Sequence, residues 1–236
     1  MVGTLLPVAE VGALCRERGL LLLVDAAQTG GACPLDMQAS QIDLLGFTGH
    51  KSLGGPMGTG GLIVGGRVDE TQLDPLIRGG TGSRSEHEVQ PDFLPDMCES
   101  GTPNVVGLAG LEVGVRWVLE RGVEAIRAHE VALTQALIDG LHSIPDVTVY
   151  GTLDPELQTA TVSFNIDGMA PSEAGLRLDD EYGILCRVGL HCAPTAHKTL
   201  GTFPTGTVRF GLSAFNTADE VQVAIAAVRQ LAKEAP

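Results

Sequence analysis

Phe47-Thr48-Gly49-His50-Lys51-Ser52-Leu53-Gly54-Gly55 is the stretch from which the rest of the chain can be interpreted. The apolar run before it, residues 42–47, predicts a short buried strand that Thr48 ends. Upstream, residues 20–28 read LLLLVDAAQ, and the run 20–24 predicts a buried parallel strand that Asp25 ends. Polar groups therefore follow two strands at their carboxyl ends, where ligands bind in open α/β sheets.

Together the two stretches offer the donor set of a pyridoxal phosphate (PLP) site. Lys51 would hold the cofactor as a Schiff base, and Asp25 would pair with the pyridinium nitrogen. Gln28 would donate to the phenolic oxygen of the ring, and Ala27 is small enough for the ring face to lie against it. Two further side chains would reach the phosphate, Thr48 and His50.

The alternatives for Lys51 are a solvated surface lysine and a P-loop lysine. Most lysines are exposed, but a surface loop seldom runs Thr-Gly-His-Lys directly out of a buried strand. The P-loop pattern requires Gly before Lys, and this chain has His50 there. Residues 54–61 also do not satisfy the dinucleotide-binding pattern G-x-G-x-x-G.

Composition excludes several function classes. The 236 residues carry a formal charge of −14, which argues against nucleic acid or an anionic membrane as the main partner. No apolar run reaches the roughly 18 residues of a membrane span. The five cysteines are odd in number and form no CxxC pair, which favours reduced thiols in a cytoplasmic protein. The start of the sequence shows no signal peptide.

A third group of polar residues lies near the carboxyl end, in RVGLHCAP (residues 187–194). Cys192 is in a loop bounded by Gly and Pro, close to Arg187 and an adjacent histidine, which favours a reactive thiolate. Arg209 offers a planar fork for a substrate carboxylate, with a surface ion pair as the alternative. His191, Cys192 and His197 match no standard zinc spacing, so we expect no metal.

Periodicity predicts the elements of the first part of the chain. Residues 7–18 form a helix with Pro7 in the first turn and Gly19 at C′, and residues 60–64 form a strand at an antiparallel edge. Residues 78–101 form a long loop of the kind that is usually functional. Asn104 caps a long helical segment that bends near Gly122.

The second part reads as a smaller α+β unit. Strands are predicted at 161–166, 184–187 and 207–213, and a helix at 171–182. Residues 217–220 form a capping box before the final helix. We therefore divide the chain into a cofactor-binding part (1–103), a connecting helical segment (104–142) and a small α+β domain (143–236).

Six motifs in this order resemble the class V aminotransferase group, and more narrowly the cysteine desulfurases and selenocysteine lyases: VDAAQ, FTGHKS, RGGTGS, ESGTPN, RVGLHCAP and VRFGLSAFNT. The resemblance implies a type I PLP-dependent transferase fold, with part of the large domain, its parallel-rich sheet, and the whole small domain. It also implies a homodimer that removes sulfur from L-cysteine or a similar amino acid, leaving alanine. A sulfur-acceptor protein and a place in iron–sulfur cluster assembly belong to the same expectation.

The resemblance also implies residue roles. Lys51 is the Schiff-base lysine and the base that moves the substrate's α-proton, and Cys192 takes the sulfur as a persulfide. Arg209 binds the substrate carboxylate with Arg187 near the same site, and Thr102 reaches the phosphate of the other subunit's cofactor.

The chain departs from the family pattern at its start and at one position. Relatives carry an upstream portion with a phosphate-binding turn, a histidine stacked on the ring and an asparagine, so we expect an N-terminally truncated form. Leu190 occupies a position where some relatives have a second histidine. Two alternatives remain: another class V aminotransferase or lyase, which would not need Cys192, and a non-catalytic remnant that acts as a partner-binding half.

Overall fold

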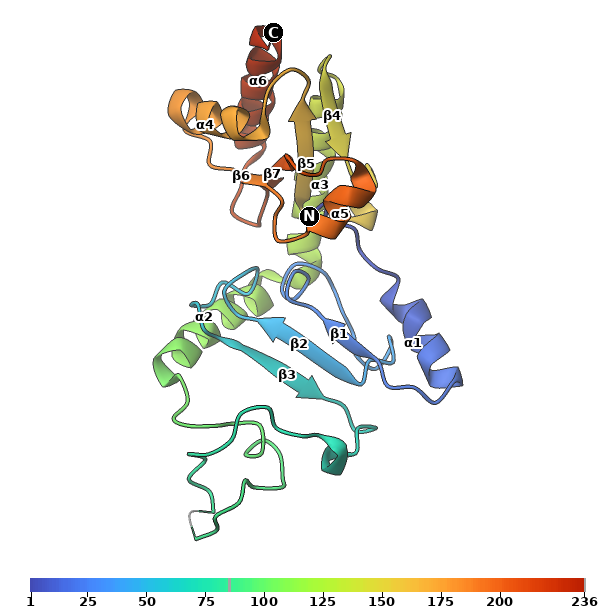
Figure 1. Cartoon of the computed structure of the whole chain (residues 1–236), viewed down its shortest axis with the longest axis vertical. Helices are drawn as coiled ribbons and strands as arrows, with labels where there is room; N and C mark the ends of the chain where they lie inside the picture. Colours follow the sequence, from blue (N-terminus) through green and yellow to red (C-terminus); the bar gives the residue numbers. More distant parts are fainter. Residues whose placement is uncertain (85, 236) are drawn as a thin grey trace. The chain divides into compact units, whose positions relative to one another are not determined.

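The computed structural model describes residues 1–84 and 86–235, which divide into two compact units. One unit is Pro7–Gly122, and the other joins Met1–Leu6 to Val123–Pro236 (Figure 1). The division falls at Gly122, inside the segment 104–142 that the sequence marks as a connector. The first helix of that segment, α2 (Val105–Arg121), lies in the first unit, and the second, α3 (Val123–His142), lies in the other.

The first unit contains a three-stranded sheet in the order β1-β2-β3. β1 (Leu23–Asp25) runs parallel to β2 (Leu44–Thr48), with Asp25 opposite Gly46. β3 (Gly60–Val64) runs antiparallel to β2, which confirms the predicted antiparallel edge. The two parallel strands therefore end at the same edge of the sheet.

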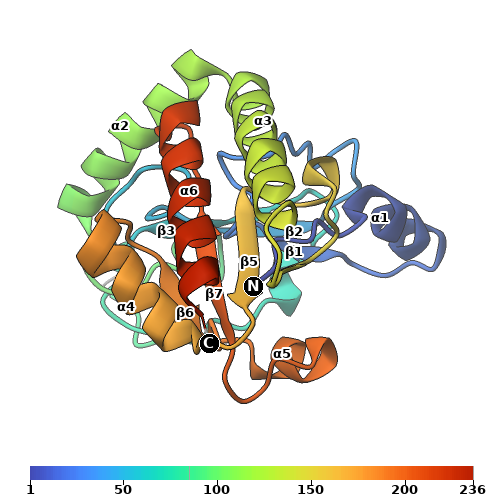
Figure 2. The same cartoon turned by 90° about the horizontal axis from the view of Figure 1, so that it is seen from above.

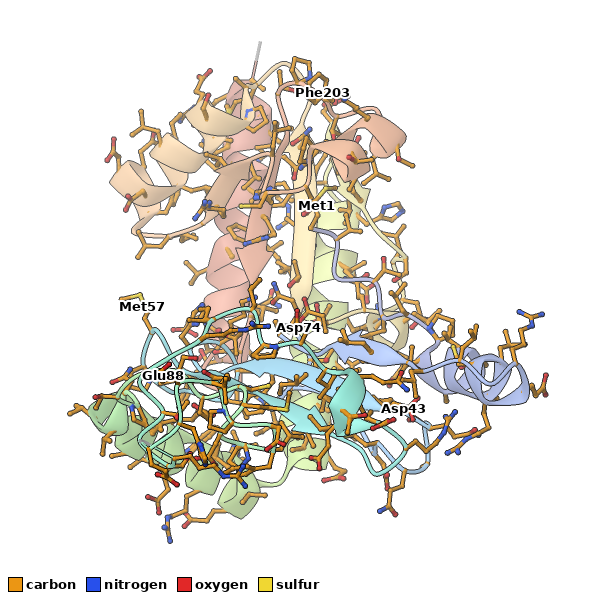
Figure 3. All side chains as sticks on the ribbon, turned by 60° about the horizontal axis from the view of Figure 1, so that its bottom comes forward. Met1, Asp43, Met57, Asp74, Glu88 and Phe203 are labelled. Carbon is orange, nitrogen blue, oxygen red and sulfur yellow. The ribbon has the colours of Figure 1, made fainter. Side chains whose placement is uncertain are left out.

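The strands predicted at 20–24 and 42–47 begin later in the structure. The carboxylate of buried Asp43 explains the shift, because it accepts a hydrogen bond from the Leu22 amide at 2.8 Å and pairs with Arg67 at 3.2 Å. The Asp43 side chain thus links the residue before β1 to Arg67, at the start of the two parallel strands (Asp43 is labelled in Figure 3). The predicted full burial of the first strand is also wrong: Leu23 is 59% exposed, since in the described residues β1 has one strand neighbour.

The helices of this unit begin and end close to the residues that the sequence predicts. α1 (Val8–Glu17) has Pro7 at the N-cap rather than in the first turn, and Gly19 follows it with a φ of +67°. Asn104 caps α2, its side chain accepting from the Gly107 amide at 3.0 Å, as predicted. Between η1 (Glu70–Gln72) and α2, the described residues of the predicted loop 78–101 form no helix or strand.

The second unit is a four-stranded antiparallel sheet in the order β4-β5-β7-β6. Its strands are β4 (Val147–Tyr150), β5 (Thr161–Ile166), β6 (Arg187–Gly189) and β7 (Thr207–Gly211). Three helices cover one face of this sheet, namely α3, α4 (Pro171–Tyr182) and α6 (Ala218–Glu234) (Figure 2). The core between them holds Phe164 and Val208 of the sheet with Leu178 and Leu231 of the helices.

Three predictions for this unit are confirmed: the strand at 161–166, the helix at 171–182, and the capping box at Thr217 and Glu220. The strand predicted at 184–187 is wrong, because the Ile184 amide donates to the Leu178 carbonyl at 2.9 Å and closes the end of α4 instead. The ladder therefore starts at Arg187. β4, η2 (Pro155–Leu157) and α5 (Pro194–Leu200) are additions that periodicity did not predict.

In the described residues, every helix is too short or too polar to cross a membrane.

Candidate active site

The carboxyl ends of β1 and β2 position the predicted cofactor residues of the first unit. Asp25 is the last residue of β1 and Thr48 the last of β2, and the parallel ladder brings both to one edge. The Asp25 carboxylate accepts from the Ala27 amide at 2.9 Å, which fixes the turn that carries Ala27 and Gln28. Asp25 thus has one oxygen engaged in the turn, and its side chain remains exposed.

A tight loop holds Lys51 beyond the end of β2. The Gly55 amide donates to the Gly49 carbonyl at 2.7 Å, and the Gly54 amide donates to the Lys51 carbonyl at 2.9 Å. Lys51 is exposed, and within the described part of the chain its ammonium forms no hydrogen bond or ion pair. The amine is therefore held by its backbone alone and is open to a reactant. Met57, 84% exposed, projects from the following turn (Figure 3).

A face of small residues on α2 lets this loop pack against the helix. A methyl group at Gly114 would overlap the Leu53 carbonyl, and one at Gly110 would lie 2.6 Å from the Pro56 ring. A methyl group at Gly107 would collide with Asn104 and lie 2.9 Å from Thr59. Close approach of helix and loop thus depends on glycines at 107, 110 and 114, whose helical spacing is a signal present in the sequence.

The residues present at this edge fit PLP in their chemistry. A methyl group at Gly46, opposite Asp25, would meet no atom within 4 Å, so the sheet face beside the carboxylate is open at this position. Thr48 Oγ1 and His50 Nδ1 lie 2.8 Å apart and form one polar group next to Lys51. Thr102 lies on a separate exposed segment, two residues before Asn104. The set thus contains an amine, a carboxylate for the ring nitrogen, and a hydroxyl and an imidazole for the phosphate.

Two arginines define the candidate substrate residues of the second unit. Arg187 and Arg209 are directly opposite on β6 and β7, on the sheet face away from the helices, while Val188 and Val208 pack into the core. Burial lowers the pKa of Arg209, and the like charge of Arg187 lowers it further. The negative charge of a Cys192 thiolate would raise the pKa of Arg209. Arg187, Arg209 and Cys192 are therefore close enough to interact electrostatically.

Cys192 lies at the tip of a strained turn. The Ala193 amide donates to the Leu190 carbonyl at 2.8 Å, and both central residues have positive φ: +48° for His191 and +59° for Cys192. Backbone of this kind is typical of glycine or asparagine, and costs other residues about 1–2 kcal/mol each. The turn exposes the Cys192 thiol and buries part of the His191 ring.

The described residues contain no group of three or more His, Cys, Asp or Glu side chains arranged to hold a metal ion. His191 Nε2 instead lies 3.1 Å from the Thr207 carbonyl and 3.0 Å from its hydroxyl. His197 Nδ1 lies 2.7 Å from the Thr202 hydroxyl. Sequence reasoning missed both threonines: Thr207 is 16 residues from His191, and Thr202, although only 5 residues from His197, lies in a turn after α5 that periodicity did not predict.

An apolar pocket of about 420 Å³ lies elsewhere in the second unit. It is formed by the end of α4, the end of β7 and the first half of α6, with Ile184, Leu212 and Val223 in its wall. Neither Cys192 nor Arg209 lines it, so it is separate from the candidate site.

Comparison with known proteins identifies similar chains. Residues 1–223 match the Aminotransferase class-V family. A probable cysteine desulfurase of Methanothermobacter thermautotrophicus is 37% identical over 94% of this chain and 56% of its own length. Another from Halobacterium salinarum is 36% identical over 96% of this chain and 54% of its own length. The apo structure of the cysteine desulfurase from Thermococcus onnurineus NA1 superimposes with a TM-score of 0.88 and 33% identity, covering 98% of this chain and 57% of that one. The chain thus spans about half the length of the relatives it matches.

Proposed function

The chain belongs to the class-V aminotransferase family, and we propose that it carries the lysine, arginine and cysteine machinery of a PLP-dependent cysteine desulfurase. Such an enzyme removes sulfur from L-cysteine and leaves alanine. The fold prediction, a partial type I PLP-dependent transferase, is confirmed by the similarity to solved cysteine desulfurases.

One observation carries the proposal beyond family membership. Cys192 is exposed at the tip of a turn with two positive φ values, within electrostatic reach of Arg209. Strain of this kind persists only where the surrounding structure maintains it, and it clusters at functional sites. A transaminase has no use for a thiol beside the group that binds the substrate carboxylate, whereas sulfur transfer requires one.

The residues of the first unit would hold the cofactor. PLP, when bound, draws electrons away from the α-carbon of an amino acid. Lys51 Nζ would hold the cofactor and take the proton from the substrate α-carbon, and Asp25 would keep the ring nitrogen protonated. The remaining roles are contact with the ring for Ala27 and Gln28, and contact with the phosphate for Thr48, His50 and, toward the other subunit's cofactor, Thr102.

The residues of the second unit would handle the substrate. Arg209, assisted by Arg187, would bind the substrate carboxylate, since a guanidinium fork matches two carboxylate oxygens. The Cys192 thiolate would attack the substrate sulfur, so that an S–S bond forms as the substrate C–S bond breaks. The electron pair of the broken bond stays on carbon, which takes a proton to become the methyl group of alanine. Cys192 retains the sulfur as a persulfide.

The partners follow from this chemistry. A persulfide must be passed on, so we include a sulfur-acceptor protein, with iron–sulfur cluster assembly as the process that consumes the sulfur. We also include a homodimer, because the role proposed for Thr102 requires a second subunit. We include a cytoplasmic location as well, because five cysteines without a CxxC pair favour reduced thiols.

The cofactor role is tested by adding PLP to the chain, reducing with borohydride and mapping the modified peptide by mass spectrometry. The expected label is on Lys51, and Lys51→Ala should remove it. Lys198→Ala is the matched control, because Lys198 is also exposed but lies over the Phe203 ring in the second unit. A label on Lys198, or one that survives Lys51→Ala, would contradict the proposal.

A further inference from the structure

The turn that carries Cys192 has to be held in its strained form by contacts outside itself. His191 and Cys192 both have positive φ, and within the turn only the Ala193 amide to Leu190 carbonyl bond closes the backbone. Ala193 is followed directly by α5, which begins at Pro194. The contacts that maintain the turn therefore come from the neighbouring elements α5 and β7.

His197 lies beneath the turn and is completely buried. Its amide donates to the Ala193 carbonyl at 3.2 Å, and its own carbonyl accepts from the amides of Thr202 at 2.9 Å and Phe203 at 3.2 Å. Its Nδ1 lies 2.7 Å from the Thr202 hydroxyl. Backbone and ring are thus fixed on both sides, and the orientation of the ring is determined.

Two ring nitrogens in this region, His191 Nδ1 and His197 Nε2, form no hydrogen bond of good geometry with the described residues, although the Leu190 carbonyl is close enough to the His197 ring to raise its pKa. Buried polar atoms are nearly always paired, so each orphan requires an explanation. The two rings are neighbours, with centroids 5.6 Å apart and planes inclined by 38°. The orphaned atoms therefore belong to adjacent side chains.

The tautomers make the two orphans complementary. His191 Nε2 faces the Thr207 carbonyl, which can only accept, so the hydrogen of the neutral ring is on Nε2 and Nδ1 is an acceptor. If His197 Nδ1 accepts from the Thr202 hydroxyl, the hydrogen of His197 is on Nε2, which is then a donor. Nδ1 of His191 thus lacks a hydrogen-bond donor, and Nε2–H of His197 lacks an acceptor of good geometry.

We propose that His197 is a positioning residue for Cys192: its Nε2–H is linked to Nδ1 of His191 through one buried water, and this link holds the turn that presents the thiol. The inference deepens the proposed function, since it concerns the thiol to which that function assigns the sulfur. His197 itself touches neither substrate nor cofactor in this assignment.

The electrostatic surroundings favour neutral rings, as this arrangement requires. Burial lowers the pKa of His191 to about 4, and the charges of Arg209, His197 and the Met1 amino group act in the same direction. Burial also lowers the pKa of His197, and the Leu190 carbonyl opposes part of this effect. Of these neighbours, only the Thr207 and Leu190 carbonyls favour a cation.

The first test is direct. In the full chain with ¹⁵N-labelled histidine, long-range ¹H–¹⁵N spectra at pH 7 should show both His191 and His197 in the Nε2–H form, assigned by His191→Gln and His197→Gln. A His197 ring in the Nδ1–H form, or a charged His197, would overturn the proposal. This measurement requires neither cofactor nor turnover, so its failure is distinguishable from failure of the desulfurase proposal.

The second test measures the thiol. Alkylation of Cys192 by iodoacetamide is followed peptide by peptide, with exposed Cys98 as the internal control. His197→Leu should change the alkylation rate of Cys192 by about tenfold, as expected for the loss of one buried hydrogen bond. The alkylation rate of Cys98 should stay the same. His197→Gln, whose amide can donate near the same point, should restore most of the rate. Equal rates in native, Leu and Gln variants would overturn the proposal, and if the Leu variant does not fold, the tautomer measurement decides.

Discussion

Arg187 and Arg209 are directly opposite each other on the antiparallel strands β6 and β7. Like charges in that relationship destabilise a sheet, and the lowered pKa of Arg209 shows that burial and the neighbouring charge both act on it. No described ion pair neutralises either guanidinium. A fold that maintains two facing cations provides a site for an anion, and a substrate carboxylate is the anion that the proposed function requires.

Replacing Arg187 by Gln should therefore stabilise the free protein. Relief of the cross-strand repulsion predicts a gain of about 0.2–1 kcal/mol in the free energy of unfolding, measured by urea denaturation followed by circular dichroism at low salt. The gain should shrink in high salt, because screening already weakens the repulsion. Arg116→Gln, which removes an exposed arginine paired with Glu112, serves as control and should not stabilise. A loss of stability in Arg187→Gln would contradict this account.

Half-buried His191 predicts how the stability of the fold depends on pH. The pKa of His191 is about 4 in the folded chain, below its ordinary value of 6.5. The unfolded chain therefore binds more protons between these values, and this contribution to stability, complete above pH 6.5, is lost as pH falls toward 4. His191→Gln should flatten the acid side of the stability curve in that window. An unchanged curve in the variant would show that His191 titrates normally when folded.

Glu130 on α3 predicts that stability depends on pH in the opposite sense. It is 3% exposed, and burial raises the pKa of its carboxyl to about 7, although Arg127 partly opposes the shift. The folded chain therefore binds more protons than the unfolded chain between pH 4.5 and 7, so stability decreases as pH rises through this range.

Glu130→Gln should raise the free energy of unfolding at pH 8 and have little effect at pH 4. A difference of one unit between the folded and unfolded pKa values corresponds to about 1.4 kcal/mol in the free energy of unfolding. The effect should therefore be measurable by denaturation at both pH values. Glu124→Gln, an exposed residue in the first turn of the same helix, is the matched control. Stabilisation that is equal at pH 4 and pH 8 would argue against titration of Glu130.

Cys192→Ala should separate cofactor chemistry from sulfur transfer. In protein that forms the Lys51 adduct, the substitution should leave the adduct intact and abolish persulfide formation after a pulse of L-cysteine, trapped by alkylation and located by mass spectrometry. Cys98→Ala, which removes the other exposed cysteine, should change neither readout. A persulfide found on Cys33 or Cys98 would exclude Cys192 as the sulfur acceptor and leave the broader class V assignment.

The sequence by itself determined those features whose interactions are local. Asn104 caps α2 through an amide three residues away, and Thr217 and Glu220 form their capping box within one turn. The position of Asp25 and Thr48 at one sheet edge follows from two short apolar runs and the parallel pairing rule. The ordered motifs identified the family, because they combine residue types with spacing, and both are written in the chain.

Tertiary structure decided what depends on partners distant in the sequence. β1 starts late because Asp43, 21 residues after Leu22, takes the Leu22 amide, and β6 starts at Arg187 because its ladder partner is Arg209. The tautomer of His191 depends on Thr207, and the unpartnered nitrogens of His191 and His197 can be identified only once the fold places the two rings side by side. Periodicity records the average environment of a side chain, whereas a hydrogen bond requires two particular atoms to meet, and only the folded backbone determines which atoms do so.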